Sequence, residues 1–152
     1  MSSTPLHYVD LRAFCYVTED ENRVEDALRL FLPAEVELTR AESEGHYGDR
    51  ILVLSSRVEN ADEIRTVLGA VGGLSESERQ RVASELDERV DENCSFFLTL
   101  DKQAAFNGTV ALGDGITLRA KVEAYPSKKP RAVENVAAVL DEISEFDPPS
   151  EE

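Results

Sequence analysis

A strict alternation of apolar and polar residues in two stretches of the chain decides most about its fold. The stretches cover residues 8–17 and 116–125, and in each of them every second residue is apolar. Successive side chains of a β-strand point to opposite faces of a sheet, so each stretch predicts a strand with one apolar face. The apolar positions are Val9, Leu11, Ala13, Cys15, Val17, Ile116, Leu118, Ala120, Val122 and Ala124. A sheet of such strands must cover its apolar face with a second layer.

Helical spacing of apolar residues in four other segments predicts that second layer. Two of these helices start with a hydroxyl residue and a glutamate at the spacing of a capping box, one starts with a lone capping residue, and one starts with proline. The start signals are Thr18 with Glu21, Asn60, Ser75 with Glu78, and Pro130.

Short strands complete the predicted sheet. They are expected over residues 36–41, 51–56, 94–100 and 109–112. The first two form a hairpin, and the last is joined to the 116–125 strand by a glycine-rich turn. The predicted order is therefore strand, helix, two strands, two helices, three strands, helix. We predict an α+β fold in which an antiparallel or mixed sheet packs on helices.

The length of 152 residues predicts a single domain, over residues 1–146, followed by a disordered acidic tail at 147–152. The longest apolar run, at 67–74, has eight residues and falls far short of the roughly 20 needed to cross a bilayer. The N-terminus lacks the features of a signal peptide. We therefore expect a cytoplasmic protein with no membrane partner.

Charge is the strongest compositional feature. The chain has 31 acidic and 16 basic residues, which gives a net charge of −15, and only four of the basic residues are lysines. Such a composition is typical of proteins from a salt-saturated cytoplasm, although a GC-rich genome also favours arginine over lysine. Residues 101–131 carry six cations and three anions, whereas the other 121 residues sum to −18. An isolated basic region on an acidic protein predicts an anion-binding site.

The start of the last predicted helix is the first candidate for that site. Lys128, Lys129 and Arg131 crowd the positive end of the helix, where cations oppose the helix dipole. Free backbone N–H groups together with cations favour phosphate. The alternative is a solvated turn. Arg119 and Lys121 lie on the outward face of the preceding strand and extend the positive strip, unless they pair with carboxylates such as that of Asp10.

Two other segments carry groups suited to a nucleotide. In the block Asp-Lys-Gln-Ala-Ala-Phe at 101–106, Lys102 is suited to phosphate and Gln103 to a base edge, while the phenylalanine is expected in the core. In the loop at 45–50, His46, Tyr47 and Arg50 offer stacking and charge. The alternative for this loop is a plain hairpin turn.

Enzymatic interpretations find little support in the sequence. It has no GxSxG, P-loop or GxGxxG motif, and no His-x-x-x-His spacing for a metal. Cys15 and Cys94 are expected to be buried thiols. We therefore predict a protein that is not an enzyme and that has no cofactor and no metal.

Five segments together resemble an archaeal family of small RNA-binding proteins known as predicted exosome subunits. They are Thr-Glu-Asp-Glu at 18–21, Gly-His-Tyr-Gly at 45–48, Glu-Arg-Val-Asp at 88–91, the 101–106 block and Ala-Tyr-Pro at 124–126. The likeness covers about residues 7–145, and the 101–106 block is its most specific part. It implies non-catalytic RNA binding, a fold like that of the ribosomal protein that binds five-S RNA, and exosome- or ribosome-related protein partners.

The sequence thus predicts an RNA-binding domain that holds phosphate at residues 128–131, with Lys102, Arg119 and Lys121 nearby. The competing interpretation is a protein-interaction module that docks an acidic partner, or joins a larger complex, through the same basic patch.

Overall fold

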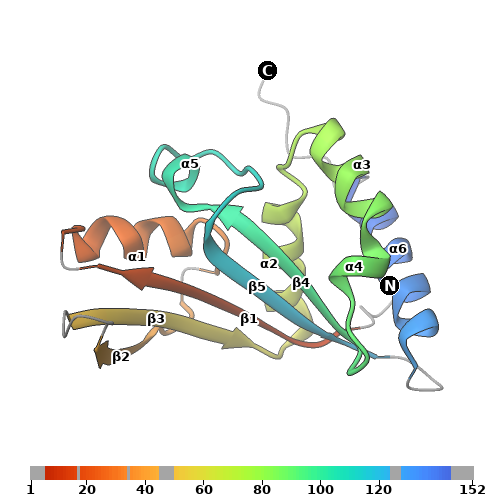
Figure 1. Cartoon of the computed structure of the whole chain (residues 1–152), viewed down its shortest axis with the longest axis horizontal. Helices are drawn as coiled ribbons and strands as arrows, with labels where there is room; N and C mark the ends of the chain where they lie inside the picture. The colour runs from red at the N-terminus through yellow and green to blue at the C-terminus, as the bar shows by residue number, and fades with distance from the viewer. Residues whose placement is uncertain (1–5, 17, 34, 45–49, 124–127, 145–152) are drawn as a thin grey trace.

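A twisted antiparallel sheet organises the computed structural model, which describes residues 6–16, 18–33, 35–44, 50–123 and 128–144 (Figure 1). Among these residues the sheet has five strands in the order β2-β3-β1-β5-β4. Their bounds are β1 (Leu6–Cys15), β2 (Thr39–Glu44), β3 (Arg50–Val58), β4 (Ser95–Asp101) and β5 (Gly115–Val122). The long β1 lies in the middle and pairs antiparallel with both β3 and β5. The predicted α+β class is confirmed, and the sheet is antiparallel throughout.

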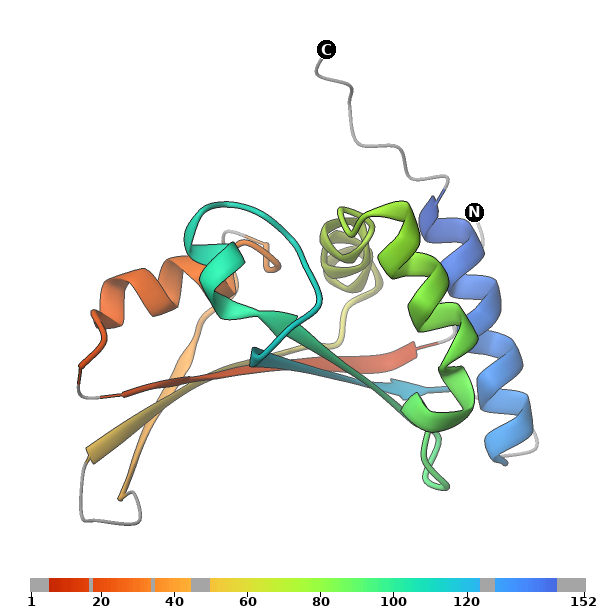
Figure 2. The ribbon, with the colours of Figure 1, turned by 45° about the horizontal axis from the view of Figure 1, so that its top comes forward.

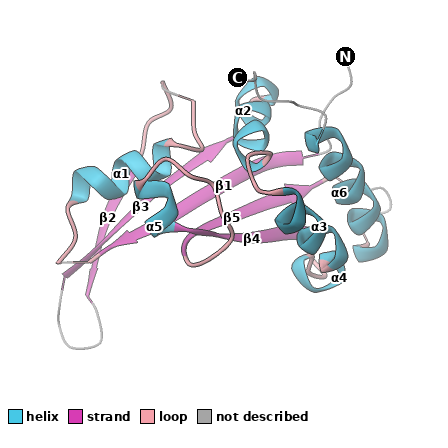
Figure 3. Cartoon of the chain, turned by 90° about the horizontal axis from the view of Figure 1, so that it is seen from above, coloured by secondary structure: helices cyan, strands magenta, loops and turns pink. Residues whose placement is uncertain are grey.

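The helices cover one face of this sheet. They are α1 (Glu21–Arg29), α2 (Ala61–Val71), α3 (Glu76–Ser84), α4 (Leu86–Arg89), α5 (Lys102–Phe106) and α6 (Lys129–Ser144). Figure 2 shows them all on the same side of the strands, and Figure 3 shows how they spread over the sheet from α1 and α5 at one end to α3, α4 and α6 at the other. No helix of the described residues lies on the opposite face.

The core lies between the two layers, on the apolar face that the alternation predicts. Leu11 and Ile116 are 0% exposed and Leu118 is 2% exposed. They pack with apolar residues of α1, α2 and α6, of which Leu28, Val67 and Ala132 are completely buried. Fully burying one such aliphatic side chain contributes about 1.5–3 kcal/mol, so the apolar positions of β1 and β5 account for much of the stability of the sheet.

Most of the predicted helix starts are observed. The Asn60 side chain accepts hydrogen bonds from the N–H groups of Asp62 and Glu63, and Ser75 with Glu78 forms a complete capping box. The first helix is an exception to the prediction, because Asp20 and not Thr18 caps it. The last helix begins at Lys129, one residue before the predicted proline.

The chain between β4 and β5 also differs from the prediction. Residues 109–112 do not form a strand: only Leu112 makes an isolated bridge, to Leu100. The short helix α5 comes first, and the chain then returns so that β5 pairs with every residue of β4. The N–H of Asp101 donates to the carbonyl of Ala111, so the returning loop takes the hydrogen bonds that a further strand would use. A second isolated bridge joins Val90 to Phe96.

None of the helices in the described part of the chain is both long and apolar enough to cross a membrane. The single domain predicted over 1–146 stays a prediction, and the tail predicted at 147–152 lies outside the described residues.

Gly115, at the start of β5, is expected to tolerate no side chain. Its φ is +110°, and an added Cβ would lie 2.6 Å from the Cβ of Lys102. We expect Gly115→Ala to lower the free energy of unfolding by about 2 kcal/mol or more, because alanine is strained at this φ and its Cβ clashes with Lys102. Chemical denaturation at constant salt measures this change.

Gly69, in α2, is the matched control, because an added Cβ there meets nothing within 4 Å. We expect Gly69→Ala to raise the stability by roughly 0.5–1 kcal/mol, as for an exposed helical glycine. Equal effects of the two substitutions on the free energy of unfolding would contradict the strain and the steric clash expected at Gly115.

Candidate nucleic-acid interface

The face of the sheet away from the helices is the candidate site, and it is called the open face below. Strand alternation places on it the side chains that do not enter the core. They are Tyr8, Asp10, Arg12 and Phe14 of β1; Thr39, Ala41 and Ser43 of β2; Ile51, Val53, Ser55 and Arg57 of β3; Ser95, Phe97, Thr99 and Asp101 of β4; and Thr117, Arg119 and Lys121 of β5. Among the described residues, no helix covers this surface (Figure 2).

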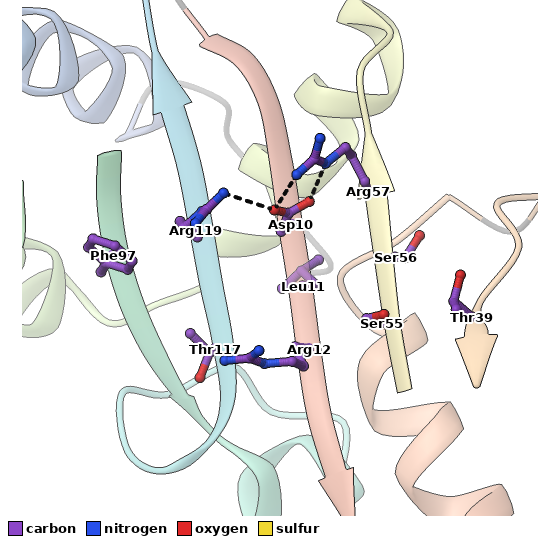
Figure 4. Close-up of a pocket in the computed structure, with 10 residues that line it drawn as sticks. All are labelled: Asp10, Leu11, Arg12, Thr39, Ser55, Ser56, Arg57, Phe97, Thr117 and Arg119. Carbon is purple, nitrogen blue, oxygen red and sulfur yellow. Dashed lines mark hydrogen bonds and ion pairs between the residues drawn. The ribbon is translucent and has the colours of Figure 1, made fainter. Parts of the chain in front are cut away.

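A row of charged groups crosses the middle of the open face. The strand register brings Arg119, Asp10 and Arg57 side by side, with Phe97 beyond Arg119 (Figure 4). Arg57 binds the Asp10 carboxylate with two hydrogen bonds, from Nε to Oδ1 at 2.7 Å and from Nη2 to Oδ2 at 3.1 Å. Arg119 approaches the same carboxylate at 3.7 Å and donates to the Tyr8 hydroxyl at 3.0 Å. One carboxylate therefore holds two guanidinium groups in place.

The two arginines remain accessible while they are held. Their side chains are 47% exposed in Arg57 and 41% exposed in Arg119. The hydrogen bond with Asp10 raises the pKa of Arg57, and its guanidinium lies 3.9 Å from the centre of the Tyr8 ring. Because Asp10 and Tyr8 already take some of their N–H donors, these two guanidinium groups are suited to single contacts with a phosphate through the donors that remain exposed.

Arg12 lies in the next row and makes no ion pair with the described residues. Its guanidinium extends towards Thr117 in Figure 4 and lies 5.7 Å from the centre of the Phe14 ring. Together with Asp10, Ser55, Thr117 and other residues it lines a pocket of about 480 Å³, within the usual size range of ligand sites. Arg12 therefore brings a positive charge to the pocket without a carboxylate partner in the described structure.

The open face is positive although the protein is strongly acidic. Its strand residues include four cations and two carboxylates, Asp10 and Asp101, whereas the whole chain sums to −15. The acids of β2 do not alter this balance, because strand alternation turns them to the helix side. Glu42 pairs with Leu52 in the register and lines a pocket with Cys15 and Glu19.

Exposed aromatic rings accompany these cations. Phe14 is 40% exposed and Tyr16, just after β1, is 47% exposed; they are the large apolar residues that the described structure leaves in solvent. Their ring centroids are 6.4 Å apart. Phe97 lines the pocket beside Arg119. Apolar surface left in water adds nothing to stability, so the rings of Phe14 and Tyr16 are candidates for contact with a ligand.

Lys102 does not lie on this surface, which corrects the sequence prediction. Its side chain is 8% exposed, and its ammonium donates to the Phe14 carbonyl at 2.8 Å and to Glu19 Oε1 at 2.9 Å. The Nζ atom also lies 5.2 Å from the centre of the Tyr16 ring. Lys102 thus anchors the end of β1 from inside the protein, and its ammonium is not free to bind phosphate.

The same contacts determine the ionisation of Glu19. Burial acts to raise its pKa, but the hydrogen bonds from the Tyr16 N–H and from Lys102 outweigh this effect and lower the pKa below its usual value. Glu19 is therefore held as a carboxylate in the folded protein.

The other predicted cations do not form one cluster with Lys102. In the β4–β5 register, Asp101 is opposite Gly115 and Ser95 is opposite Lys121, so Lys102 and Lys121 lie at opposite ends of this strand pair, roughly 20 Å apart. Lys121 donates to the Asn93 carbonyl, and Arg119 pairs with Asp10, which is the alternative that the sequence left open.

The start of α6 carries further basic residues on the helix side of the sheet. Lys128 and Arg131 are exposed and Lys129 is partly buried; the Lys128 carbonyl accepts from the N–H groups of Arg131 and Ala132. Arg131 also pairs with Glu134 at 3.1 Å.

The remaining predicted residues are only partly placed. Gln103 is exposed on α5, at the Lys102 end of the sheet. His46 and Tyr47 lie outside the described residues, as does the side chain of Arg50.

Sequence reasoning missed Arg12, Arg57, Tyr8, Phe14 and Phe97 as site residues. A signal was present in the 8–17 stretch, whose outward face carries three aromatic residues and an arginine where a solvated strand usually carries plain polar side chains. Arg57 gave no such signal, because its place beside Asp10 depends on the pairing of β1 with β3.

Comparison with known proteins relates this surface to a family. A family model described as RNA binding matches residues 8–122, a range that extends to the end of β5. The chain belongs to this family. It is also 35% identical over 144 residues to RNA-binding protein PAB1135 of Pyrococcus abyssi, across 89% of this chain and 94% of the relative. The predicted membership of an archaeal RNA-binding family is confirmed.

Two solved structures of similar proteins share the fold. Protein AF2318 from Archaeglobus fulgidus, a DUF54 protein, has a TM-score of 0.80 at 28% identity, over 88% of this chain and 99% of that chain. Mth689, a DUF54 protein from Methanothermobacter thermautotrophicus, has a TM-score of 0.76 at 36% identity, over 89% of this chain and 98% of that chain. The arrangement of sheet and helices is therefore common to this chain and these two proteins.

Lys102→Met tests the anchoring role of Lys102. The substitution keeps the length of the side chain but removes the ammonium that donates to Glu19 and to the Phe14 carbonyl. We expect the free energy of unfolding to fall by about 2–3 kcal/mol. Denaturation at constant salt measures it; a change below about 0.5 kcal/mol, as at ordinary surface positions, would contradict the anchor.

Glu19 predicts a pH dependence of stability. Because its pKa is lower in the folded than in the unfolded protein, its contribution is complete above the unfolded value of about 4.3 and is lost as the pH falls through the folded value. We expect the wild-type protein to lose more stability than Glu19→Gln on acidification below about pH 4.3. Thermal denaturation of both proteins across this range gives the comparison, and parallel curves would exclude this contribution.

Proposed function

We propose that this protein binds RNA on the open face of its sheet and does so without catalysis. The observation that carries the proposal is the row of exposed cations and aromatic rings on the helix-free side of the sheet, in a chain whose net charge is −15. Membership of an RNA-binding family and the likeness to a relative named as an RNA-binding protein support it.

The acidic bulk of the protein is compatible with this function. A composition rich in acids and poor in lysine favours a salt-rich cytoplasm, where the Debye length falls to about 3 Å at molar salt. Repulsion between RNA and the distant acidic groups is then screened, and counterion release contributes little to affinity. Contacts at close range, made by guanidinium groups and rings on one surface, supply the binding energy instead.

The sequence resemblance adds narrower proposals. It supports an association with RNA processing or degradation, in particular with the exosome, and a likeness to the ribosomal protein that binds five-S RNA. These rest on the 101–106 block and its companion segments alone. A protein-interaction module remains the competing function, and nuclease treatment of a pulldown separates the two: partners that disappear with the RNA favour RNA binding, and partners that persist favour the module.

Arg12→Glu tests the open face directly. Arg12 makes no ion pair with the described residues, so its loss leaves the Asp10 row intact. We expect the affinity for RNA to fall about tenfold or more, which corresponds to about 1.4 kcal/mol. A filter-binding assay at near-native salt measures the change.

Two variants with equal or larger charge changes serve as controls. Arg23→Glu alters an exposed arginine of α1, on the helix side, where it lies 4.5 Å from the Phe106 ring. Lys128→Glu/Lys129→Glu alters the start of α6. We expect Arg23→Glu to retain RNA binding. If only the double lysine variant loses RNA, the interface belongs at α6 and not on the open face.

A further inference from the structure

We infer that the open face takes unpaired RNA, with one base stacked on Phe14, a second on Phe97, and a phosphate held by Arg12. This inference rests on the proposed function and specifies its ligand. Three of the four cations on the open face already bind acceptors of the protein, whereas Phe14 is exposed to solvent.

The cations of the face are mostly engaged. Arg57 and Arg119 share the Asp10 carboxylate, and Lys121 donates to the Asn93 carbonyl. Arg12 is the arginine of the face without an ion pair in the described structure. A double helix is held chiefly by many contacts to phosphates and 2′-hydroxyls, because its bases are hidden in the stack. A face with so little unengaged charge is poorly suited to a duplex.

The aromatic rings, unlike most of these cations, have surface that a ligand can reach. Phe14 is 40% exposed, and its neighbours on the face are the Tyr16 ring at 6.4 Å and the Arg12 guanidinium at 5.7 Å from the ring centre. Phe97 lies in the lining of the pocket. Unpaired bases stack on such rings whatever their sequence, and each stacked base contributes more than a screened phosphate contact does at high salt.

The positions of the three groups suit a single strand. Phe14 lies two residues after Arg12 on the same face of β1, and their 5.7 Å separation puts positive charge beside the ring. Phe97 lies two strands away and opposite Arg119, roughly 16 Å from Phe14 by ordinary strand spacings. An RNA strand that passes from one ring to the other crosses β5 at Thr117, with Arg12 beside it in the pocket.

The polar groups beside Arg12 are suited to the ribose of an RNA strand. Hydroxyl side chains in the pocket can both donate to and accept from a ribose 2′-hydroxyl, and Asp10 faces the same space. A protein partner with an acidic segment would use the arginines equally well but would not require flat rings. The aromatic character of Phe14 is therefore the property to test.

The test compares an unstructured oligouridylate of about 12 nucleotides, a length within the range of single-strand sites, with an RNA hairpin of equal length. Fluorescence anisotropy with the full-length protein gives both dissociation constants at low and at near-native salt. We expect the oligouridylate to bind more tightly, and its advantage to grow with salt, because stacking persists when phosphate contacts are screened.

Substitutions of Phe14 then identify the interaction. We expect Phe14→Ala and Phe14→Leu each to weaken oligouridylate binding about fivefold or more, and Phe14→Trp to preserve it. Phe14→Leu keeps an apolar side chain, so it separates stacking from general hydrophobic contact. Phe97→Ala is expected to act in the same direction. Phe106→Leu, which makes the same exchange on the helix side of the sheet, is the matched control and should leave binding unchanged.

The outcomes are distinct. A hairpin that binds as tightly as the oligouridylate, or a Phe14→Leu variant with unchanged affinity, overturns the inference while RNA binding on the open face stands. Loss of binding in Lys128→Glu/Lys129→Glu alone moves the RNA to α6 and overturns both. Absence of binding to either RNA, with the fold intact by circular dichroism, also overturns both. Because Phe14 is exposed, its variants are expected to keep the wild-type melting temperature within a few degrees.

Discussion

Burial of one face of β1 determines the arrangement of the other elements. This strand pairs on both sides, with β3 and with β5, and its core residues are almost completely buried under the helical layer. Because side chains alternate, covering one face leaves the opposite side chains of the same strands together on a second surface. The surface with Asp10, Arg12 and Phe14 is therefore a direct geometric consequence of the core.

That second surface is kept in order by electrostatics. Asp10 draws two arginines from neighbouring strands into a row, and the acids of β2 are turned away from it. The Asp10 carboxylate adds one negative charge to the surface, but it also orders the long side chains of Arg57 and Arg119. These side chains therefore lose less conformational entropy when a ligand binds. The acidic character of the remaining surface is a matter of solubility and leaves this region unchanged.

Periodic features of the sequence predicted more of this structure than isolated residues did. Alternation identified β1 and β5 and the outward direction of Arg119 and Lys121, and the caps at Asn60 and Ser75 identified helix starts. The segment after β4 was not predictable in this way, because its hydrogen bonds join a returning loop to the end of β4 and do not form a regular strand pair. Lys102 was placed wrongly for a related reason: a lysine is almost never buried, and its two acceptors are distant in sequence, at the end of β1 and in the turn that follows it.

The two isolated bridges beside β4 have a consequence for the behaviour of the protein at high concentration. A sheet edge with unpaired N–H and C=O groups is a template for strands of other molecules. The bridges at Phe96 and Leu100 occupy both ends of the outer edge of β4 and leave only a short segment between them. At the other edge, all six residues of β2 are exposed, and Arg40, Glu42 and Glu44 are charged. The sheet therefore resists edge-to-edge aggregation while its broad face stays accessible.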